Sequence, residues 1–281
     1  MPELPEVEIT ARLLGEATRG AKIDKVRVQG LSTLKSFEPP IEALTGLRIE
    51  RITRRGKHLL ISAGGKFSLL IHLMSAGRLQ LYDKPASIKD RSTRIAIAIE
   101  GTKELRLREF GTKQSAWAKL IEDSQLKNEA VLSSLGPEAW PKPPALEGLL
   151  SGNRPLHSIL RDQRVIAGIG RSWVDEILHL AKLSPFKKPA DLSAEQMDEL
   201  RESMIVCLSG ALAHYEKELS LPLPDKLPMP LRVHRHNTEP CWRCSTTIEA
   251  VFYENHVMCY CPVCQTDGKV LKDRRLSRLL K

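Results

Sequence analysis

The residues best suited to covalent chemistry stand at the start of the chain, MPELPEVE, where a proline at position 2 precedes Glu3 and Glu6. A small second residue usually allows removal of the initiator methionine, which would leave Pro2 as a secondary amine with a pKa of ~8, partly unprotonated at neutral pH. Attack of that amine on an aldehydic carbon gives an iminium cation, which withdraws electrons strongly, and nearby carboxylates can then move protons. The structural alternative is that Pro2 starts a helix and that the negative charges of the glutamates stabilise the positive end of the helix dipole.

A second chemical signal lies near the C-terminus. Four of the six cysteines form two Cys-x-x-Cys pairs separated by sixteen residues: Cys241 and Cys244, then Cys261 and Cys264. This spacing is typical of four thiolates around one structural Zn²⁺, with a β-hairpin between the pairs, and two redox pairs are the alternative. Cys259 and His256 stand near the second pair as competing ligands, whereas Cys207 lies in an apolar helical run that predicts a buried thiol.

The composition favours a polyanionic partner. The 281 residues include 43 Lys and Arg against 34 Asp and Glu, a formal net charge of +9, and such a balance is common among nucleic-acid-binding proteins. No apolar run approaches the ~20 residues that span a bilayer, and the N-terminus lacks the pattern of a secretory signal. We therefore expect a soluble, intracellular protein that associates with no membrane.

The elements that must position these groups follow from the hydrophobic period. Residues 5–20 place apolar side chains on one helical face. From Lys22 to about Tyr82 the period changes to two, with Gly64-Gly65 as a hairpin turn, and RIAIAIE, EGT and ELRLREFG predict another hairpin. The N-terminal part is thus predicted as a helix followed by an antiparallel β-sandwich.

The second half of the chain is predicted to be helical. A stretch rich in proline and glycine from Asp123 to Pro155 indicates the crossing between domains. Three helical segments follow, and the longest starts from the cap Ser193 with Gln196 three residues later. We predict an α+β protein with a catalytic domain at 1–134, a helical domain at 135–231, a zinc finger at 232–268 and a basic tail at 269–281.

Several motifs occur in one order along nearly the whole chain: PELPEVE, RRGKHLL, HLMSAGRL, LREFG, LGPEA, RDQRVIAGIG and the four-cysteine hairpin ending in CQ. Together they resemble the formamidopyrimidine-DNA glycosylase and endonuclease VIII family of base-excision repair enzymes. The resemblance implies a DNA glycosylase that is also a lyase, works on damaged DNA through a Schiff base on its N-terminal proline, and binds DNA with a helix-two-turn-helix domain and a zinc hairpin.

The resemblance also assigns chemistry to matching residues. Pro2 would attack C1′ of the damaged nucleotide and expel the base, Glu3 would assist sugar opening and proton transfer, and Glu6 would help to shape the lesion site. β and then δ elimination would cut both sides of the abasic sugar. Lys57 matches a lysine that contacts phosphate near the lesion, whereas its sequence context alone predicts a solvated strand residue.

Further matches concern the gap left by a nucleotide that leaves the base stack. His72 begins one loop of DNA-contacting residues, in which the family's wedge methionine aligns with Ser75 while Met74 lies one place early. Arg108 and Phe110 match the arginine and phenylalanine of a second loop. The residue that fills the gap is therefore open between these candidates.

Three positions depart from the family pattern. Glu109 replaces a second basic residue, which predicts a weaker phosphate contact there. Arg171 stands after the GIG turn where asparagine is common, and an arginine can still hold a phosphate. His256 aligns with the arginine at the tip of the zinc hairpin, and a neutral histidine attracts phosphate far less.

The substrate class follows less directly. The segment YEKELSLPLPDKLPMPLRV is short and lacks the longer sequence that caps oxidised purines in the formamidopyrimidine branch, which favours oxidised pyrimidines or an unusual lesion. The departures keep open a catalytically weak or inactive relative that binds damaged or abasic DNA. A zinc-ribbon component of an RNA assembly would leave MPELPEVE unexplained. The basic tail forms either a short amphipathic helix or a solvated end.

Overall fold

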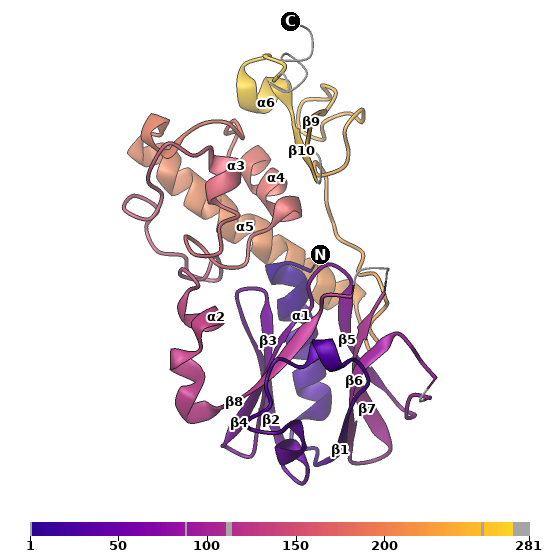
Figure 1. Ribbon diagram of the computed structural model, residues 1–281. Coiled ribbons are helices and arrows are strands. Elements are labelled where there is room, and N and C mark those ends of the chain that lie inside the picture. The colour runs from indigo at the N-terminus through magenta and orange to yellow at the C-terminus, as the bar shows by residue number, and fades with distance from the viewer. Residues whose placement is uncertain (1, 88, 111–113, 254–255, 272–281) are drawn as a thin grey trace, which may run out of the picture. The chain divides into compact units, whose positions relative to one another are not determined.

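The computed structural model describes residues 2–87, 89–110, 114–253 and 256–271 (Figure 1). Met1, whose removal the predicted chemistry requires, and the tail beyond residue 271 lie outside the described residues. The chain forms two compact units. Unit 1 comprises Met1–Ser134 and Leu212–Pro228, and unit 2 comprises Leu135–Ala211 and Met229–Lys281.

Unit 1 is built from an N-terminal helix and antiparallel strands. Its helices and strands are α1 (Leu4–Thr18), β1 (Ile23–Val28), β2 (Ile49–Arg55), β3 (His58–Ala63), β4 (Phe67–His72), β5 (Gly77–Tyr82), β6 (Thr93–Ile99), β7 (Lys103–Glu109), β8 (Trp117–Glu122) and α2 (Ala130–Ser133), with short 3-10 helices η1 (Leu31–Thr33), η2 (Ile41–Leu44) and η3 (Asp123–Asn128). One sheet has the strand order β1-β6-β7-β5 and the other β2-β3-β4-β8. Helix α1 packs on β2 and also contacts β3 and β5, so it touches both sheets of the sandwich (Figure 1).

The N-terminal helix and the predicted hairpins are specified locally. Pro5 stands in the first turn of α1, where its fixed φ suits the helix, and the Glu3 backbone N–H donates to Glu6 Oε2 at 2.8 Å. Gly64 and Gly65 have φ of 63° and 61°, which only glycine adopts readily, and they join β3 to β4. The predicted helix, sandwich and hairpins are confirmed.

The core of unit 1 includes a segment from far along the chain. Residues 219–228, which we call the return segment, follow the long helix α5 (Ala194–Glu218) and pack on the sandwich. Leu223 is 5% exposed within the core, and Leu219, Leu221 and Leu227 pack against it. Burial of these leucines holds the proline-rich segment in place.

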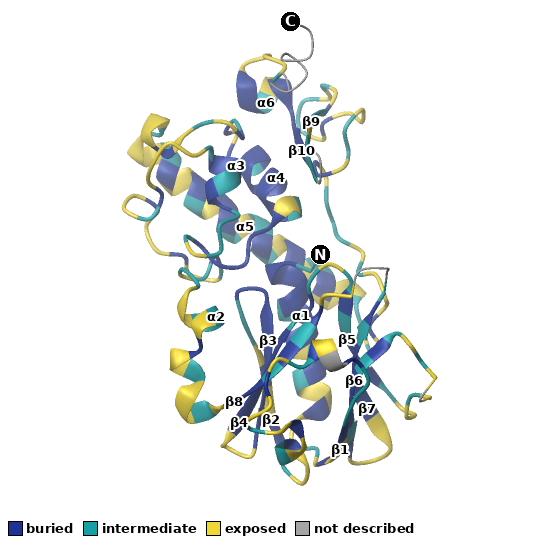
Figure 2. Ribbon diagram, in the orientation of Figure 1, coloured by how far each residue is buried: buried dark blue, intermediate teal, exposed yellow. Residues whose placement is uncertain are grey.

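Unit 2 combines helices with a β-hairpin. Its elements are α3 (Leu156–Ile159), α4 (Arg171–Leu180), η4 (Pro189–Asp191), α5 (Ala194–Glu218), β9 (Glu249–Tyr253), β10 (His256–Tyr260) and α6 (Pro262–Thr266), and α5 passes into unit 1 from Leu212 onward. Ser193 and Gln196 cap α5 reciprocally, since each backbone N–H donates to the other's side chain at 3.3 Å. Buried faces alternate with exposed ones along α5 (Figure 2). The predicted α+β class and the hairpin between the cysteine pairs are confirmed.

A buried carboxylate joins the helices of unit 2 to the cysteine-bearing segment. Glu176 of α4 is 8% exposed, and its Oε1 accepts from the backbone N–H groups of Arg232, Val233 and His234 at 2.9 to 3.1 Å. Burial raises the pKa of Glu176, against the effect of these donors. The chain entering the cysteine hairpin is thus fixed to α4 by hydrogen bonds to one side chain.

Candidate functional site

The N-terminal acids and a distant tyrosine form one buried hydrogen-bonded group. Glu3 and Glu6 are 2% and 3% exposed. One Glu6 oxygen accepts from the Glu3 backbone N–H at 2.8 Å, and the other accepts from the Tyr215 hydroxyl at 2.7 Å. Burial, reinforced by the negative charge of Glu6, raises the pKa of Tyr215, so its phenol remains a proton donor. Sequence reasoning misses Tyr215 because it stands 209 residues from Glu6 and reads as an apolar position of a long helix.

Pro2 borders a small open pocket beside this group. Its walls include Pro2, Glu6, Thr10, Arg78, Gln80 and Leu223. Burial lowers the pKa of the Arg78 guanidinium, while the charges of Asp225 and Glu6 oppose that shift. The predicted nucleophile thus borders a pocket lined by a guanidinium, a carboxylate, an amide and apolar side chains.

The return segment is tied to the strands beside the pocket. Gln80 Nε2 donates to Leu223 O at 2.7 Å and to Asp225 Oδ1 at 3.0 Å, and Arg78 Nε donates to Asp225 O at 2.6 Å. Arg108 Nη1 lies 3.4 Å from the same Asp225 carboxylate. Asp225 therefore lies against Arg108, one of the predicted DNA contacts. The alternation SLPLPDKLP of leucine and proline was the available sequence signal for a segment that packs on a sheet.

Lys57 lies in the turn between β2 and β3 and is 7% exposed. Gly56 has a φ of 55°, the left-handed conformation that a tight turn needs. The alternative of a solvated strand lysine is wrong, because the turn carries Lys57 inward. A buried ammonium is expected to act on a specific anionic group and not merely to keep the surface hydrated.

His72 ends β4 within an aromatic cluster. Its ring stacks on Trp117 with centroids 5.9 Å apart and lies 4.6 Å from the ring of His58. Burial, followed by the positive charges of His58 and Lys57, lowers the pKa of His72 to about 3, and burial lowers that of His58 to about 4. Both imidazoles are neutral near pH 7, so His72 can offer a hydrogen bond to DNA but no charge.

The two loops predicted to insert into DNA meet in unit 1. The Phe110 backbone N–H donates to Ala76 O at 3.2 Å, and the Arg108 guanidinium lies 4.6 Å from the Phe110 ring centroid. Met74 is half-buried with a φ of 50°, whereas Ser75 is exposed at the loop surface. Both loops can therefore present side chains together, with Arg108 and Phe110 already stacked.

Glu109 is turned into the protein. It is 3% exposed, and its Oε1 accepts from the backbone N–H groups of Ser115 and Ala116 at 2.6 and 2.9 Å. The carboxylate thus anchors the chain that leads into β8. Glu109 therefore orders the loop, and its carboxylate is buried.

The turn before α4 gathers donors for an anion. Gln163 donates to Arg161 O and Ile169 O at 2.9 and 2.8 Å, and its oxygen accepts from the Gly168 N–H at 2.9 Å. Gly168 has a φ of 109°, a conformation closed to other residues. Arg171 is exposed at the first position of α4, where the helix dipole favours phosphate. The predicted α3 helix is short, Leu156–Ile159, because this turn replaces its continuation.

His256 lies at the start of β10 and comes near the same helix end. Its ring stacks on Tyr253 with centroids 4.4 Å apart and lies 6.2 Å from His157. Burial, followed by the positive charges of Arg161 and Arg171, lowers the pKa of His256 to about 4. The structure therefore brings His256 and Arg171 into one positive region, with the imidazole itself neutral near pH 7.

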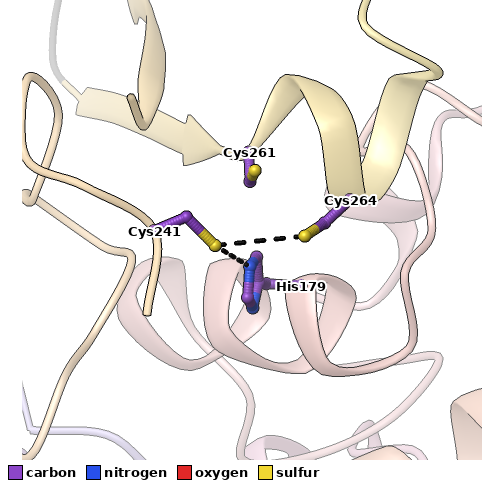
Figure 3. Close-up of side chains that lie close together, drawn as sticks. All are labelled: His179, Cys241, Cys261 and Cys264. Atoms are coloured by element: carbon purple, nitrogen blue, oxygen red, sulfur yellow. Dashed lines mark hydrogen bonds between the residues drawn. The ribbon is translucent and has the colours of Figure 1, made fainter. Parts of the chain in front are cut away.

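The four predicted cysteine ligands converge, and a histidine joins them. Sγ atoms lie 3.9 Å apart for Cys241 and Cys264, 3.4 Å for Cys244 and Cys261, and 3.5 Å for Cys244 and Cys264. Figure 3 shows His179 of α4 pointing into the cluster, with Nε2 3.2 Å from Cys241 Sγ. The group His179, Cys241, Cys261 and Cys264 could hold a metal ion, its ligand atoms lying within 4.8 Å of one another.

Two details of this cluster refine the prediction. Cys259 Sγ accepts from the Arg235 N–H at 3.2 Å, and Cys259 is absent from the group that could hold a metal ion, which includes Cys261 and Cys264. His179 is missed by sequence reasoning, because a histidine on the apolar face of a helix reads as part of the core. Burial, followed by the charge of Arg243, lowers the pKa of His179 to about 4, which keeps the imidazole neutral.

Two family profiles match the chain. The formamidopyrimidine-DNA glycosylase N-terminal domain matches residues 1–113, and the formamidopyrimidine-DNA glycosylase H2TH domain matches residues 135–221. A formamidopyrimidine-DNA glycosylase of Latilactobacillus sakei is 30% identical over 275 residues, covering 94% of this chain and 98% of that protein. An uncharacterized formamidopyrimidine-DNA glycosylase-like protein of Mycobacterium tuberculosis is 43% identical over 150 residues, covering 53% of this chain and 95% of its own length.

Solved structures are similar over the same extent. A Lactococcus lactis Fpg mutant in complex with Fapy-dG-containing DNA has a TM-score of 0.83 at 28% identity, covering 94% of this chain and all of that one. The Lactococcus lactis Fpg in complex with abasic-site DNA has a TM-score of 0.83 at 26% identity, covering 94% and 99%. Within the described residues, no helix combines the length and apolar character that a membrane crossing requires.

Proposed function

Because the chain belongs to the formamidopyrimidine-DNA glycosylase and endonuclease VIII family, we propose that it removes damaged bases from DNA and then cleaves the abasic site. Damaged DNA is the proposed partner, the monomer is the proposed active form, and the cytoplasm, beside the chromosome, is the proposed location. The carrying observation is the N-terminal group, in which Pro2 borders a pocket and is followed by two buried carboxylates. A nucleophile and proton carriers are what base expulsion and elimination need.

The proposed reaction starts when the unprotonated Pro2 nitrogen bonds to C1′ and the bond from C1′ to the base breaks. The base leaves with a proton, the sugar ring opens as Glu3 protonates its oxygen, and an iminium joins Pro2 to C1′. Loss of a C2′ proton then expels the 3′ phosphate, and a second elimination expels the 5′ phosphate. Hydrolysis of the iminium returns Pro2. The cation supplies the electron sink for both eliminations.

DNA is proposed to lie against residues of both units. Lys57 would hold a phosphate beside the lesion, His72 would add a neutral hydrogen bond, and Arg108 with Phe110 would fill the gap left by the flipped nucleotide. Met74 is the second candidate for that gap, being half-buried beside the same loop. In unit 2, Arg171 and the N–H groups at the start of α4 would grip phosphate, with His256 as a neutral partner.

We propose that the cysteine cluster holds one structural zinc ion. Ligands at ~2.3 Å from a tetrahedral zinc stand about 3.8 Å from one another, and the Sγ separations of 3.4 to 3.9 Å fit this value. Cys241, Cys244, Cys261 and Cys264 would be the ligands, and His179 would donate its Nε2–H to the Cys241 thiolate. The ion would fix the hairpin that carries His256.

Oxidised pyrimidines are the proposed preferred lesions, with an unusual lesion as the other possibility. The pocket beside Pro2 is small, and the return segment closes one side of it. This preference rests on the short segment between α5 and the cysteine hairpin, which lacks the longer sequence that caps oxidised purines. A panel of duplexes carrying oxidised pyrimidines, 8-oxoguanine or a formamidopyrimidine, scored for base release and strand cleavage, tests this preference.

Trapping with borohydride tests the proposed activity. Reduction during incubation with an abasic-site duplex converts an iminium into a stable amine, so we expect a covalent protein–DNA adduct with the processed protein and none with Pro2→Gly. Removal of Met1 is checked beforehand by mass spectrometry. Tight binding of abasic DNA without an adduct would contradict the enzymatic proposal and favour a damage-binding relative.

A further inference from the structure

Tyr215 is a buried polar side chain next to the proposed nucleophile that the proposed reaction does not use. It lies on the last turns of α5, within unit 1, and is 0% exposed. Its hydroxyl donates to Glu6 Oε1 at 2.7 Å, and Glu6 Oε2 accepts from the Glu3 backbone N–H at 2.8 Å. Through Glu6, these two hydrogen bonds connect Tyr215 to the peptide bond between Pro2 and Glu3.

This linkage can fix the direction of the Pro2 amine. The Glu3 nitrogen is bonded to the Pro2 carbonyl carbon, and the peptide between them is planar. Once the Glu3 N–H is held by Glu6, the Pro2 Cα and carbonyl are held as well, and the amine can move only by rotation about the Pro2 Cα–C bond. A carboxylate bound through only one oxygen could still rotate, whereas the Tyr215 hydroxyl occupies the other and removes that freedom.

The charges around Glu6 favour the same reading. Arg78 of β5 and the Glu3 carboxyl of the N-terminal segment lie close enough to act on this group, and the Pro2 amine borders the same pocket. A buried carboxylate needs hydrogen bonds to remain charged, and the phenol supplies one of them. A phenylalanine would fill the same core space but leave one Glu6 oxygen without this donor.

We propose that Tyr215 is a positioning residue that orients the nucleophilic Pro2 amine through the Glu6 carboxylate. The inference rests on the proposed glycosylase and lyase function. Tyr215 does not touch the DNA or the reacting atoms in this scheme. Its contribution is to raise the fraction of Pro2 amine that points at C1′.

The test compares Tyr215→Phe with wild type in single-turnover borohydride trapping on an abasic-site duplex across pH, with DNA in excess. Misplacement of a reacting group costs up to ~100-fold, so we expect the trapping rate to fall by roughly tenfold or more. The acidic limb of the rate profile moves to higher pH, because the charged carboxylate has lost a donor. Affinity for a duplex with a tetrahydrofuran abasic analogue stays within about twofold, since binding does not use the amine.

Two further variants separate positioning from general stability. Tyr260→Phe is the matched control, because Tyr260 is also 0% exposed and its hydroxyl accepts from the Leu271 N–H at 2.7 Å in unit 2. It should lower the melting temperature without changing the pH profile. Tyr215→Phe in a Glu6→Ala background should add no further loss, since removal of the carboxylate already breaks the linkage.

The outcomes are distinct for the two levels of the proposal. Trapping by wild type with an unchanged rate and profile for Tyr215→Phe would overturn the positioning role alone. The same would follow if Tyr215→Phe and Tyr260→Phe lost rate equally, or if the double variant showed additive losses. Absence of any adduct with processed wild-type protein would overturn the proposed function, and the positioning role with it.

Discussion

Replacing Asp225 by asparagine should tighten the binding of damaged DNA. Asp225 Oδ1 lies 3.4 Å from Arg108 Nη1, so the return segment would compete with DNA for this arginine in its proposed role. The two side chains are 59% and 19% exposed, which makes this a partly solvated pair worth about 0.5–1 kcal/mol. Asparagine keeps the Oδ1 acceptor that Gln80 and Arg108 both use, so the segment should stay in place while the ionic attraction on Arg108 is removed. Because binding would no longer have to break this ion pair, the affinity for damaged DNA should rise about two- to fivefold.

Fluorescence anisotropy with a tetrahydrofuran-containing duplex at ~0.15 M salt measures this change. Asp83→Asn serves as the matched control, because it removes the same charge from an exposed position just after β5. The gain should disappear in an Arg108→Ala background. Equal affinities for Asp225→Asn and Asp83→Asn would refute the idea that the return segment holds Arg108 back from DNA.

Three other perturbations test separate parts of the structure. Glu176→Ala leaves two buried N–H groups, those of Val233 and His234, and the part-buried N–H of Arg232 without their acceptor. It should cost about 3 kcal/mol in the free energy of unfolding, measured by denaturant titration, and a loss below ~0.5 kcal/mol would contradict this anchoring. Burial lowers the pKa of His58 to about 4, so on acidification the unfolded chain takes up a proton below pH 6.5 that the folded protein does not. The free energy of unfolding should therefore fall by about 2 kcal/mol from pH 7 to 5. His58→Gln should remove that part of the pH dependence. His179→Ala should retain one zinc per chain and bind it ~10–100-fold more weakly in chelator competition, whereas Cys244→Ala should lose the metal. Loss of the metal by His179→Ala and its retention by Cys244→Ala would instead make His179 the ligand.

Local features of the sequence predict much of the fold. Period-two runs with Gly64-Gly65 between them specify a hairpin through backbone conformation alone, and the Ser193 cap marks the start of α5. The spacing of Cys261 and Cys264 selects them over Cys259 because only a short turn lets two thiolates face one ion. In each case the information lies within a few residues.

Contacts between distant segments are what the sequence does not reveal. Tyr215 reads as one more apolar position of α5, and its pairing with Glu6 depends on where that helix ends in unit 1. The return segment reads as a linker because of its prolines, yet its alternating leucines join the core, and Asp225 reaches Arg108 only through that packing. His179 likewise joins the cysteines only once α4 and α6 are folded against each other.

Peptide mapping of the borohydride-trapped complex tests the central claim most directly. After nuclease and protease digestion, mass spectrometry should find the abasic-sugar remnant on an N-terminal peptide that begins at Pro2. A remnant on Lys57 or another lysine, or an active enzyme whose N-terminal peptide still carries Met1, would contradict catalysis by the proline amine.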